Sequence, residues 1–192
     1  MSDFLDLARR RYSVRTYLPQ PVEAEKLERI LEAGRVAPTA KNNQPHRILI
    51  VQSPEGLEKL TKCTNVQGYP LGIVVCGVQS EAWVSPFDPN KNSLETDTSI
   101  VATHMLLEAT ALGLGSCWMA RFEPERLREA FNIPEGIVPE HTFSPSATRR
   151  AKRSRPIAMT RCASLLRLPS SGNIFRNGAP PSVHRGQPPS TH

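Results

Sequence analysis

Basic and hydroxyl side chains stand close together near the start of the chain, in the stretch RRRYSVR at residues 9–15. Planar guanidinium groups beside a hydroxyl are well suited to hold a phosphate or an anionic ring through paired hydrogen bonds. Three consecutive arginines are also typical of a solvated helix end. The stretch therefore indicates either an anion-binding site or an ordinary helix terminus.

A second polar stretch, APTAKNNQPHR at residues 37–47, contains two prolines, a hydroxyl and three amides. The prolines partly fix the backbone, so the amides are either positioned for a ligand or part of a simple connecting loop. A third stretch, GSCWMARF at residues 115–122, follows the longest apolar segment of the chain. Each of the three signals is weak when taken alone.

No pattern for metal binding or hydrolysis accompanies these stretches. The five histidines have no cysteine or carboxylate at metal-ligand spacing, and the chain contains no Walker loop, GxSxG elbow or GxGxxG sequence. The pair Glu123 and Glu125 is explained by the solvated face of a helix. The sequence therefore predicts no metal site and no side chain acting as a catalytic acid or base.

Helices and short strands must hold the three stretches in place. Apolar spacing predicts helices over residues 3–11, 21–36 and 123–133, a short helix from Pro54, and a long apolar helix from Asp97 to Gly113. Asp97 is expected to be the N-cap of that long helix. Apolar runs predict strands at residues 47–52, 72–78 and 115–122. This alternation predicts an α/β or α+β layered domain.

Charge is distributed unevenly along the 192 residues. The formal net charge is +6, yet all 18 acidic residues lie at or before Glu140. Nine of the 24 Lys and Arg follow Glu140, so the first 140 residues carry a net charge of −3. The basic tail could bind nucleic acid nonspecifically through its charge, but with Phe143 and Phe175 alone it lacks the aromatics of a stacking surface. We expect no specific nucleic-acid partner.

Composition indicates a single well-buried domain in the cytoplasm. No apolar run approaches the ~20 residues of a membrane span, and MSDFLDLARRR lacks the apolar core of a secretory signal. The four cysteines show no CxxC spacing, which favours buried free thiols in a reducing compartment.

Taken in order, the three stretches resemble the FMN-dependent nitroreductase family of NAD(P)H-dependent flavin oxidoreductases. The likeness is carried by RRYSVRTYLPQPV, LEAGRVAPTAKNNQPHRILIV and ATHMLLEATALGLGSCWMARF, and it covers residues 4–140. The resemblance implies an α+β fold, a three-layer α/β/α sandwich around a mixed, mainly antiparallel sheet. It also implies a homodimer with two FMN molecules at the subunit interface.

The resemblance implies a role for individual residues. Arg11 would meet the FMN phosphate, Ser13 the flavin ring, and Arg15 the pyrimidine edge, where a fixed cation favours the negative charge left by reduction. The loop at residues 37–47 would be donated by the partner chain, and the segment after residue 118 would offer backbone N–H groups. The implied cofactor-binding residues are Arg11, Tyr12, Ser13, Arg15, Pro38, Thr39, Ala40, Asn42, Met119 and Ala120.

The implied activity is transfer of hydride from NAD(P)H through bound FMN to a nitroaromatic, a quinone or a similar small acceptor by a ping-pong mechanism. No side chain is assigned a catalytic role, because the flavin carries the hydride chemistry. A flavin fold with other reductive chemistry, such as dehalogenation, is an alternative, but the short segment at residues 80–96 favours the plain reductase. A second alternative is an inactive family member with an altered C-terminus.

After Glu140 the sequence departs from the family pattern. Relatives continue with an apolar strand that often ends in Leu-Gly-Tyr-Pro, whereas this chain continues with HTFSPSATRRAKRSRP. Residues 146–150 can be encoded TCG GCT ACC CGG CGG, and one preceding C in another frame gives Leu-Gly-Tyr-Pro-Ala. We interpret the change as a reading-frame shift, with natural divergence as the alternative. The predicted organisation is a domain over residues 1–140 and an irregular Arg/Pro/Ser-rich tail over residues 141–192 that lacks the last strand.

Overall fold

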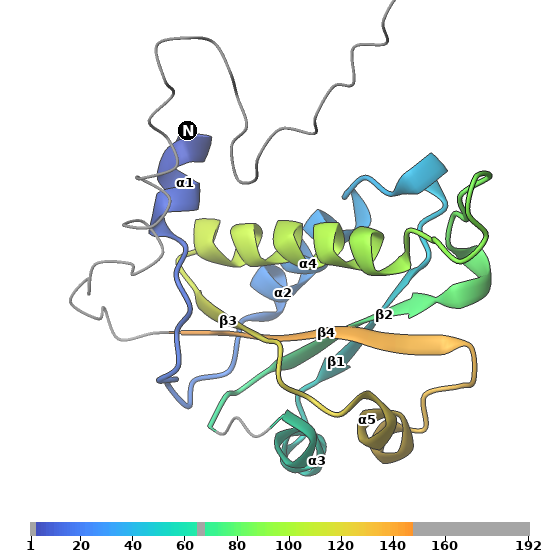
Figure 1. Ribbon diagram of the computed structural model, residues 1–192. Coiled ribbons are helices and arrows are strands. Elements are labelled where there is room, and N and C mark those ends of the chain that lie inside the picture. The colour runs from blue at the N-terminus through green and yellow to red at the C-terminus, as the bar shows by residue number, and fades with distance from the viewer. Residues whose placement is uncertain (1–2, 65–67, 148–192) are drawn as a thin grey trace, which may run out of the picture. The chain divides into compact units, whose positions relative to one another are not determined.

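Three layers build the domain in the computed structural model, which describes residues 3–64 and 68–147 (Figure 1). The middle layer is an antiparallel sheet of four strands in the order β1-β2-β4-β3. These strands are His46–Val51 (β1), Gly72–Val78 (β2), Gly115–Met119 (β3) and Ile137–Ser146 (β4). The predicted α+β sandwich is confirmed, and the strand predicted at residues 72–78 has the predicted bounds.

Helices cover both faces of the sheet (Figure 1). One face carries α2 (Ala24–Arg35) and α4 (Leu94–Ala111), and the other carries α3 (Pro54–Thr64) and α5 (Pro124–Phe131). The N-terminal helix α1 (Phe4–Arg10) contacts α4 and has no buried residue. Two short 3-10 turns, η1 (Ala40–Asn42) and η2 (Gln79–Glu81), lie in the connections.

Side chains of the central strand β2 point alternately into two separate cores. Ile73 and Val75 pack with α2 and α4, whereas Val74 and Cys76 pack with α3 and α5. All four are at most 3 % exposed. Burial on both faces explains why this strand is a continuous apolar run without polar alternation.

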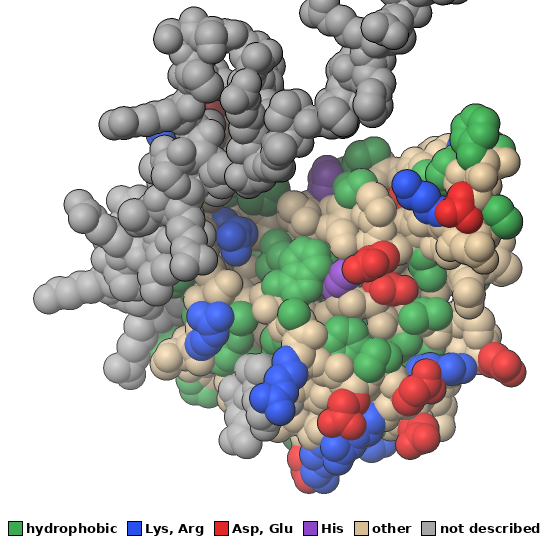
Figure 2. Space-filling view, viewed as in Figure 1, with side chains coloured by type: hydrophobic (Ala, Val, Ile, Leu, Met, Phe, Trp, Pro, Cys, Tyr) green, Lys and Arg blue, Asp and Glu red, His purple; other side chains and the backbone are tan. Residues whose placement is uncertain are grey.

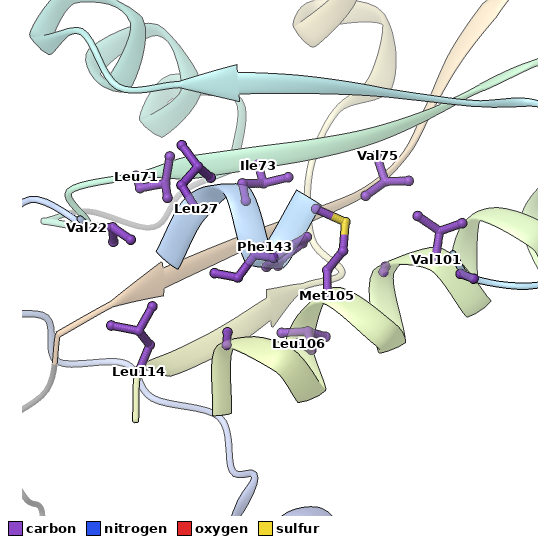
Figure 3. Close-up of a cluster of buried hydrophobic side chains, with 14 residues drawn as sticks. Val22, Leu27, Leu71, Ile73, Val75, Val101, Met105, Leu106, Leu114 and Phe143 are labelled. Carbon is purple, nitrogen blue, oxygen red and sulfur yellow. The ribbon is translucent and has the colours of Figure 1, made fainter. Parts of the chain in front are cut away.

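Phe143 lies at the centre of the larger core, between the sheet and the α2/α4 layer (Figure 3). It is fully buried and belongs to β4. Leu27 from α2, Ile73 from β2 and Met105 from α4 surround it in the same cluster. The packing of both helices on the sheet therefore depends on a residue that follows Glu140.

The prediction that the chain becomes irregular after Glu140 is wrong for residues 141–146, which form the second half of β4. These residues pair with β2 as far as Phe143 and with β3 as far as Ser146. This pairing, on both edges at Thr142 and Phe143 and on the β3 edge beyond them, satisfies backbone hydrogen-bonding groups and outweighs the low strand propensity of serine and proline. The predicted boundary at residue 140 therefore falls inside a central strand. Residues 148–192 of the predicted tail lie outside the described residues.

The second half of β4 places polar side chains in the interior, where Thr142, Ser144 and Ser146 are each fully buried. The Thr142 hydroxyl donates to the Met119 carbonyl oxygen at 2.9 Å. The hydroxyls of Ser144 and Ser146 have no hydrogen-bond partner among the described residues. An unsatisfied buried hydroxyl costs about 1–3 kcal/mol, whereas a typical hydrogen bond contributes about 1 kcal/mol.

We expect Ser144→Ala to raise the free energy of unfolding by about 1 kcal/mol, because it removes a hydroxyl that has no partner. The matched change Thr142→Val on the same strand is expected to lower it by about 1 kcal/mol, because it removes a hydrogen bond. Urea unfolding of both variants measures the two effects. Destabilisation by Ser144→Ala would show that its hydroxyl has a partner.

The long helix α4 begins three residues earlier than predicted, at Leu94, and its N-cap is Ser93. The prediction that Asp97 is the N-cap is wrong, because Asp97 lies inside the first turn with its side chain 2 % exposed. A Cβ on Gly77 would lie 2.4 Å from Leu94 Cδ1, so glycine at this position lets the start of α4 approach β2 closely.

Candidate cofactor site

The N-terminal arginine segment lies along the outer edge of β3. Ser13 forms a parallel bridge with Ser116, and the Val14 N–H donates to the Ser116 carbonyl oxygen at 2.9 Å. Val14 is 5 % exposed and therefore points inward. Because side chains alternate along an extended segment, Arg11, Ser13 and Arg15 share the opposite side.

Arg11 and Arg15 of this segment are available to a ligand. Arg11 and Arg15 are exposed, and none of the ion pairs within residues 3–64 and 68–147 includes either of them or the exposed Arg121. Figure 2 shows Lys and Arg side chains without acidic neighbours on the side where Figure 1 places β3, whereas acidic and basic groups mix beside α3 and α5. Cations without acidic partners favour the binding of an anion.

The loop between α2 and β1 has an unusual backbone. Lys41, Asn42 and Gln44 have φ angles of 51°, 54° and 49°, in the left-handed region that residues other than glycine rarely adopt. Each such residue costs about 1–2 kcal/mol, and strain of this kind is concentrated where a loop binds ligand. The Asn42 side chain is exposed and forms no hydrogen bond with any described residue. Its amide is therefore free to contact a ligand.

Hydrogen bonds hold this loop in shape. The Ala40 N–H donates to Asp97 Oδ1 at 2.9 Å, and the Gln44 N–H donates to Thr39 Oγ1 at 3.0 Å. The Asn43 side-chain amide donates to the Glu81 carbonyl at the end of η2. The Ala40 N–H is therefore used within the protein, and Ala40 can offer a cofactor only its carbonyl and methyl groups. The sequence did not reveal Asp97 as a hydrogen-bond partner of this loop, because its position in the chain suggested a helix cap.

The third predicted stretch ends β3. Met119 is 4 % exposed, its side chain packs in the α3/α5 core, and its carbonyl accepts the Thr142 hydroxyl. Ala120 is exposed just beyond the strand. At about 3.3 Å per residue, Ala120 lies ~13 Å along the strand direction from Ser116, the partner of Ser13. The N-terminal segment and this strand end therefore lie at the same edge of the sheet.

Within a single chain, the loop between α2 and β1 lies far from the β3 edge of the sheet. Asp97, which bonds to Ala40 of the loop, lies in the first turn of α4, whereas Ser116 follows the end of the helix. From Asp97 to Ala111 the helix rises 1.5 Å per residue, which is about 21 Å. Figure 1 likewise shows the connection between α2 and β1 and the start of β3 at opposite ends of α4. The two halves of the predicted site are thus far apart within one molecule.

Comparison with known proteins decides the family. The family model described as "Nitroreductase family" matches residues 8–67 and 62–143, which is well over half of the chain. The chain belongs to the nitroreductase family. Its members are NAD(P)H-dependent flavin oxidoreductases, and the predicted enzyme class is confirmed.

Individual relatives agree with the match. The nitroreductase chain is 34 % identical over 146 residues to an Archaeoglobus fulgidus protein named as an NADH dehydrogenase/NAD(P)H nitroreductase, covering 72 % of this chain and 81 % of that one. A crystal structure of a nitroreductase family protein from Clostridium difficile 630 has a TM-score of 0.77 and 39 % identity, covering 83 % and 96 %. A structure titled FMN-dependent nitroreductase from Clostridium difficile R20291 has a TM-score of 0.67 and 27 % identity, covering 81 % and 93 %.

Two histidines of the nitroreductase chain have shifted acidity. Burial lowers the pKa of His141, whose Nε2 lies 2.9 Å from Ser99 Oγ, and the Glu95 carbonyl and charge oppose that shift. Burial and the Arg47 charge lower the pKa of His46, and the charge of Asp97 opposes that shift. Sequence reasoning did not single out either residue. His141 links β4 to α4 as a hydrogen-bonded interior side chain.

The described cysteines, Cys63, Cys76 and Cys117, are buried free thiols, as predicted. Burial raises the pKa of the Cys76 thiol to about 12, so this group is unreactive at neutral pH. Cys162 lies outside the described residues. In the described ranges no three His, Cys, Asp or Glu side chains form a group that could hold a metal ion. The helices in those ranges are also too short or too polar to span a membrane.

Proposed function

We propose that this nitroreductase binds FMN between two copies of the chain and passes hydride from NAD(P)H to a nitroaromatic, a quinone or a similar acceptor by a ping-pong mechanism. The observation that carries the proposal is the position of two complementary half-sites at opposite ends of α4. One half offers exposed arginines and a hydroxyl, and the other offers a strained loop with a free amide. A second copy related by two-fold symmetry would supply the missing half to each site.

The residues present fit the chemistry of FMN. Arg11 would hold the phosphate through charge-assisted hydrogen bonds, and Ser13 and Arg15 would meet the ring. Thr39 and Asn42 would come from the partner copy, with Pro38 and Ala40 lining the loop. When bound, FMN supplies the hydride transfer. The chain itself binds and orients the cofactor, and the Arg15 charge favours the negative charge that reduction brings.

The surface of α4 supports a second copy. Apolar residues are spread around the axis of this helix and are not confined to one stripe, which is typical of a helix covered on more than one side. Ile100, His104 and Leu107 are nevertheless half-buried, and Thr103 is exposed. Large apolar side chains are also exposed elsewhere, including Phe4 at 68 % and Leu5 at 50 %. A homodimer would cover such surfaces.

The names of two relatives support the proposed reductant, the proposed nitroaromatic acceptor and the proposed cofactor. The Archaeoglobus fulgidus relative is named for NADH dehydrogenase and NAD(P)H nitroreductase activity, and the Clostridium difficile R20291 structure is titled FMN-dependent. The arginine segment lies along the outer edge of β3 with Arg11 and Arg15 exposed, which suits a site that admits a reductant and then a small acceptor in turn.

The proposal is tested on the purified full chain. The protein is mixed with FMN and desalted, its visible spectrum is recorded, and NADH or NADPH is added without oxygen. We expect retained flavin bands that bleach and that return when a nitroaromatic is added, and parallel double-reciprocal plots in steady state. Arg11→Ala should weaken FMN binding by about 10–100-fold, since a charged hydrogen bond contributes about 1.5–3 kcal/mol. A folded chain that retains no flavin would overturn the proposal.

A further inference from the structure

Asp97 is the only carboxylate among the buried polar side chains of residues 3–64 and 68–147. A buried charge is costly unless it is paired or hydrogen-bonded. No ion pair in these ranges includes Asp97. Its two oxygens instead accept from the Ala40 N–H at 2.9 Å and from the Ser93 hydroxyl at 2.7 Å. Its place in the first turn of α4 adds the favourable dipole of a helix N-terminus.

The Ala40 contact connects the loop to the core across 57 positions in sequence. The other side-chain hydrogen bonds that hold the loop are exposed, and they run from Asn43 to η2, from the Gln44 N–H to Thr39, and from the Gln44 side chain to the Arg35 carbonyl. Three left-handed residues follow Ala40 within the next four positions. Such a backbone persists only where its surroundings determine it, and the partly buried bond to a charged acceptor is the strongest of these restraints.

We propose that Asp97 is the positioning residue of the cofactor loop, the connection between α2 and β1. It holds the strained backbone of this loop in the shape that contacts the FMN bound by the arginines of the partner copy. This inference rests on the proposed function. Asp97 itself would not touch the cofactor. It would act through the Ala40 N–H, so that Asn42 is presented in a fixed orientation before the flavin arrives and little ordering is needed on binding.

The test compares variants at both ends of the hydrogen bond. Asp97→Ala removes the acceptor, and Asp97→Asn keeps a carbonyl oxygen that can accept from Ala40 but removes the charge. Ala40→Pro removes the donor at the first position of η1, where proline is tolerated, and the preceding Thr39 already has the extended backbone that proline requires. Thr98→Val is the matched control, because Thr98 is a fully buried polar residue next to Asp97 whose hydroxyl reaches no loop residue.

Two quantities are measured, the hydrogen exchange of the Ala40 amide without FMN and the Kd for FMN. We expect Asp97→Ala to speed Ala40 exchange, to leave exchange on β2 unchanged, and to weaken FMN binding at least about tenfold. Turnover at saturating FMN should change less than about twofold, since uniform loss of binding leaves kcat intact. Asp97→Asn should lie between the wild type and Asp97→Ala. Thr98→Val should change neither quantity.

Each other outcome is informative. Faster Ala40 exchange with an unchanged Kd would overturn the positioning role, and so would unchanged exchange in Asp97→Ala. Additive effects of Asp97→Ala and Ala40→Pro would also overturn it, because two ends of one bond must be coupled. A wild-type chain that binds no FMN would defeat the proposed function itself, and that failure is visible before any variant is compared.

Discussion

A heterodimer of two defective chains is expected to contain one high-affinity FMN site. One chain carries Arg11→Ala and Arg15→Ala, and the other carries Asn42→Gly, which removes the amide but keeps a backbone with positive φ. If each site takes its arginines from one copy and its loop from the other, one site of the heterodimer has both defects and the other has none. The two homodimers should bind FMN at least about tenfold more weakly than the wild type.

Co-expression with two different affinity tags isolates the heterodimer, and titration with FMN counts its tight sites. A site formed within one chain would leave no tight site in this heterodimer. The reverse pairing is the control: a chain with all three changes, combined with a wild-type chain, should have no tight site when the site is shared and one when it is not. The two pairings therefore give opposite results under the two arrangements.

In the proposed shared site, local sequence patterns mark the candidate residues, whereas their arrangement across two chains was implied only by the family resemblance. The motifs around Ser13 and Asn42 are local and readable along the chain. Their separation of about 21 Å along α4 follows from tertiary structure. Asp97 shows the same limit, because its local position at the start of a helix predicted a cap, whereas its contact with Ala40 joins segments far apart in sequence.

The fold was predictable where a pattern is strong. The apolar run of β2 predicted its bounds, and the helices around Leu27 and Leu127 follow from amphipathic spacing. The second half of β4 was not predictable in this way, since HTFSPS has neither apolar alternation nor high strand propensity. Its conformation depends on neighbours on both sides, with Phe143 opposite Ile73 on β2 and opposite Trp118 on β3.

Phe143→Ala is expected to lower the free energy of unfolding by about 3–5 kcal/mol, because it removes a fully buried ring from the centre of the larger core. A domain of this size loses roughly 2–4 °C of Tm per kcal/mol, so the expected fall is about 6–20 °C. Phe143→Leu keeps most of the apolar volume and should cost less than about 2 kcal/mol. Phe87→Ala is the matched control, because this ring is 96 % exposed and its loss should change stability by less than about 0.5 kcal/mol.

The same experiment distinguishes a packed strand from an irregular segment at residues 141–146. If residues 141–146 were irregular, as the composition of the tail predicts, Phe143→Ala would cost no more than Phe87→Ala. A large and graded loss from phenylalanine through leucine to alanine would place Phe143 in the core, because the cost follows the volume removed from a packed site. It would also show that the departure from the family pattern leaves the central strand intact. The α2/α4 layer, which carries the loop and Asp97, would then keep its support from the sheet.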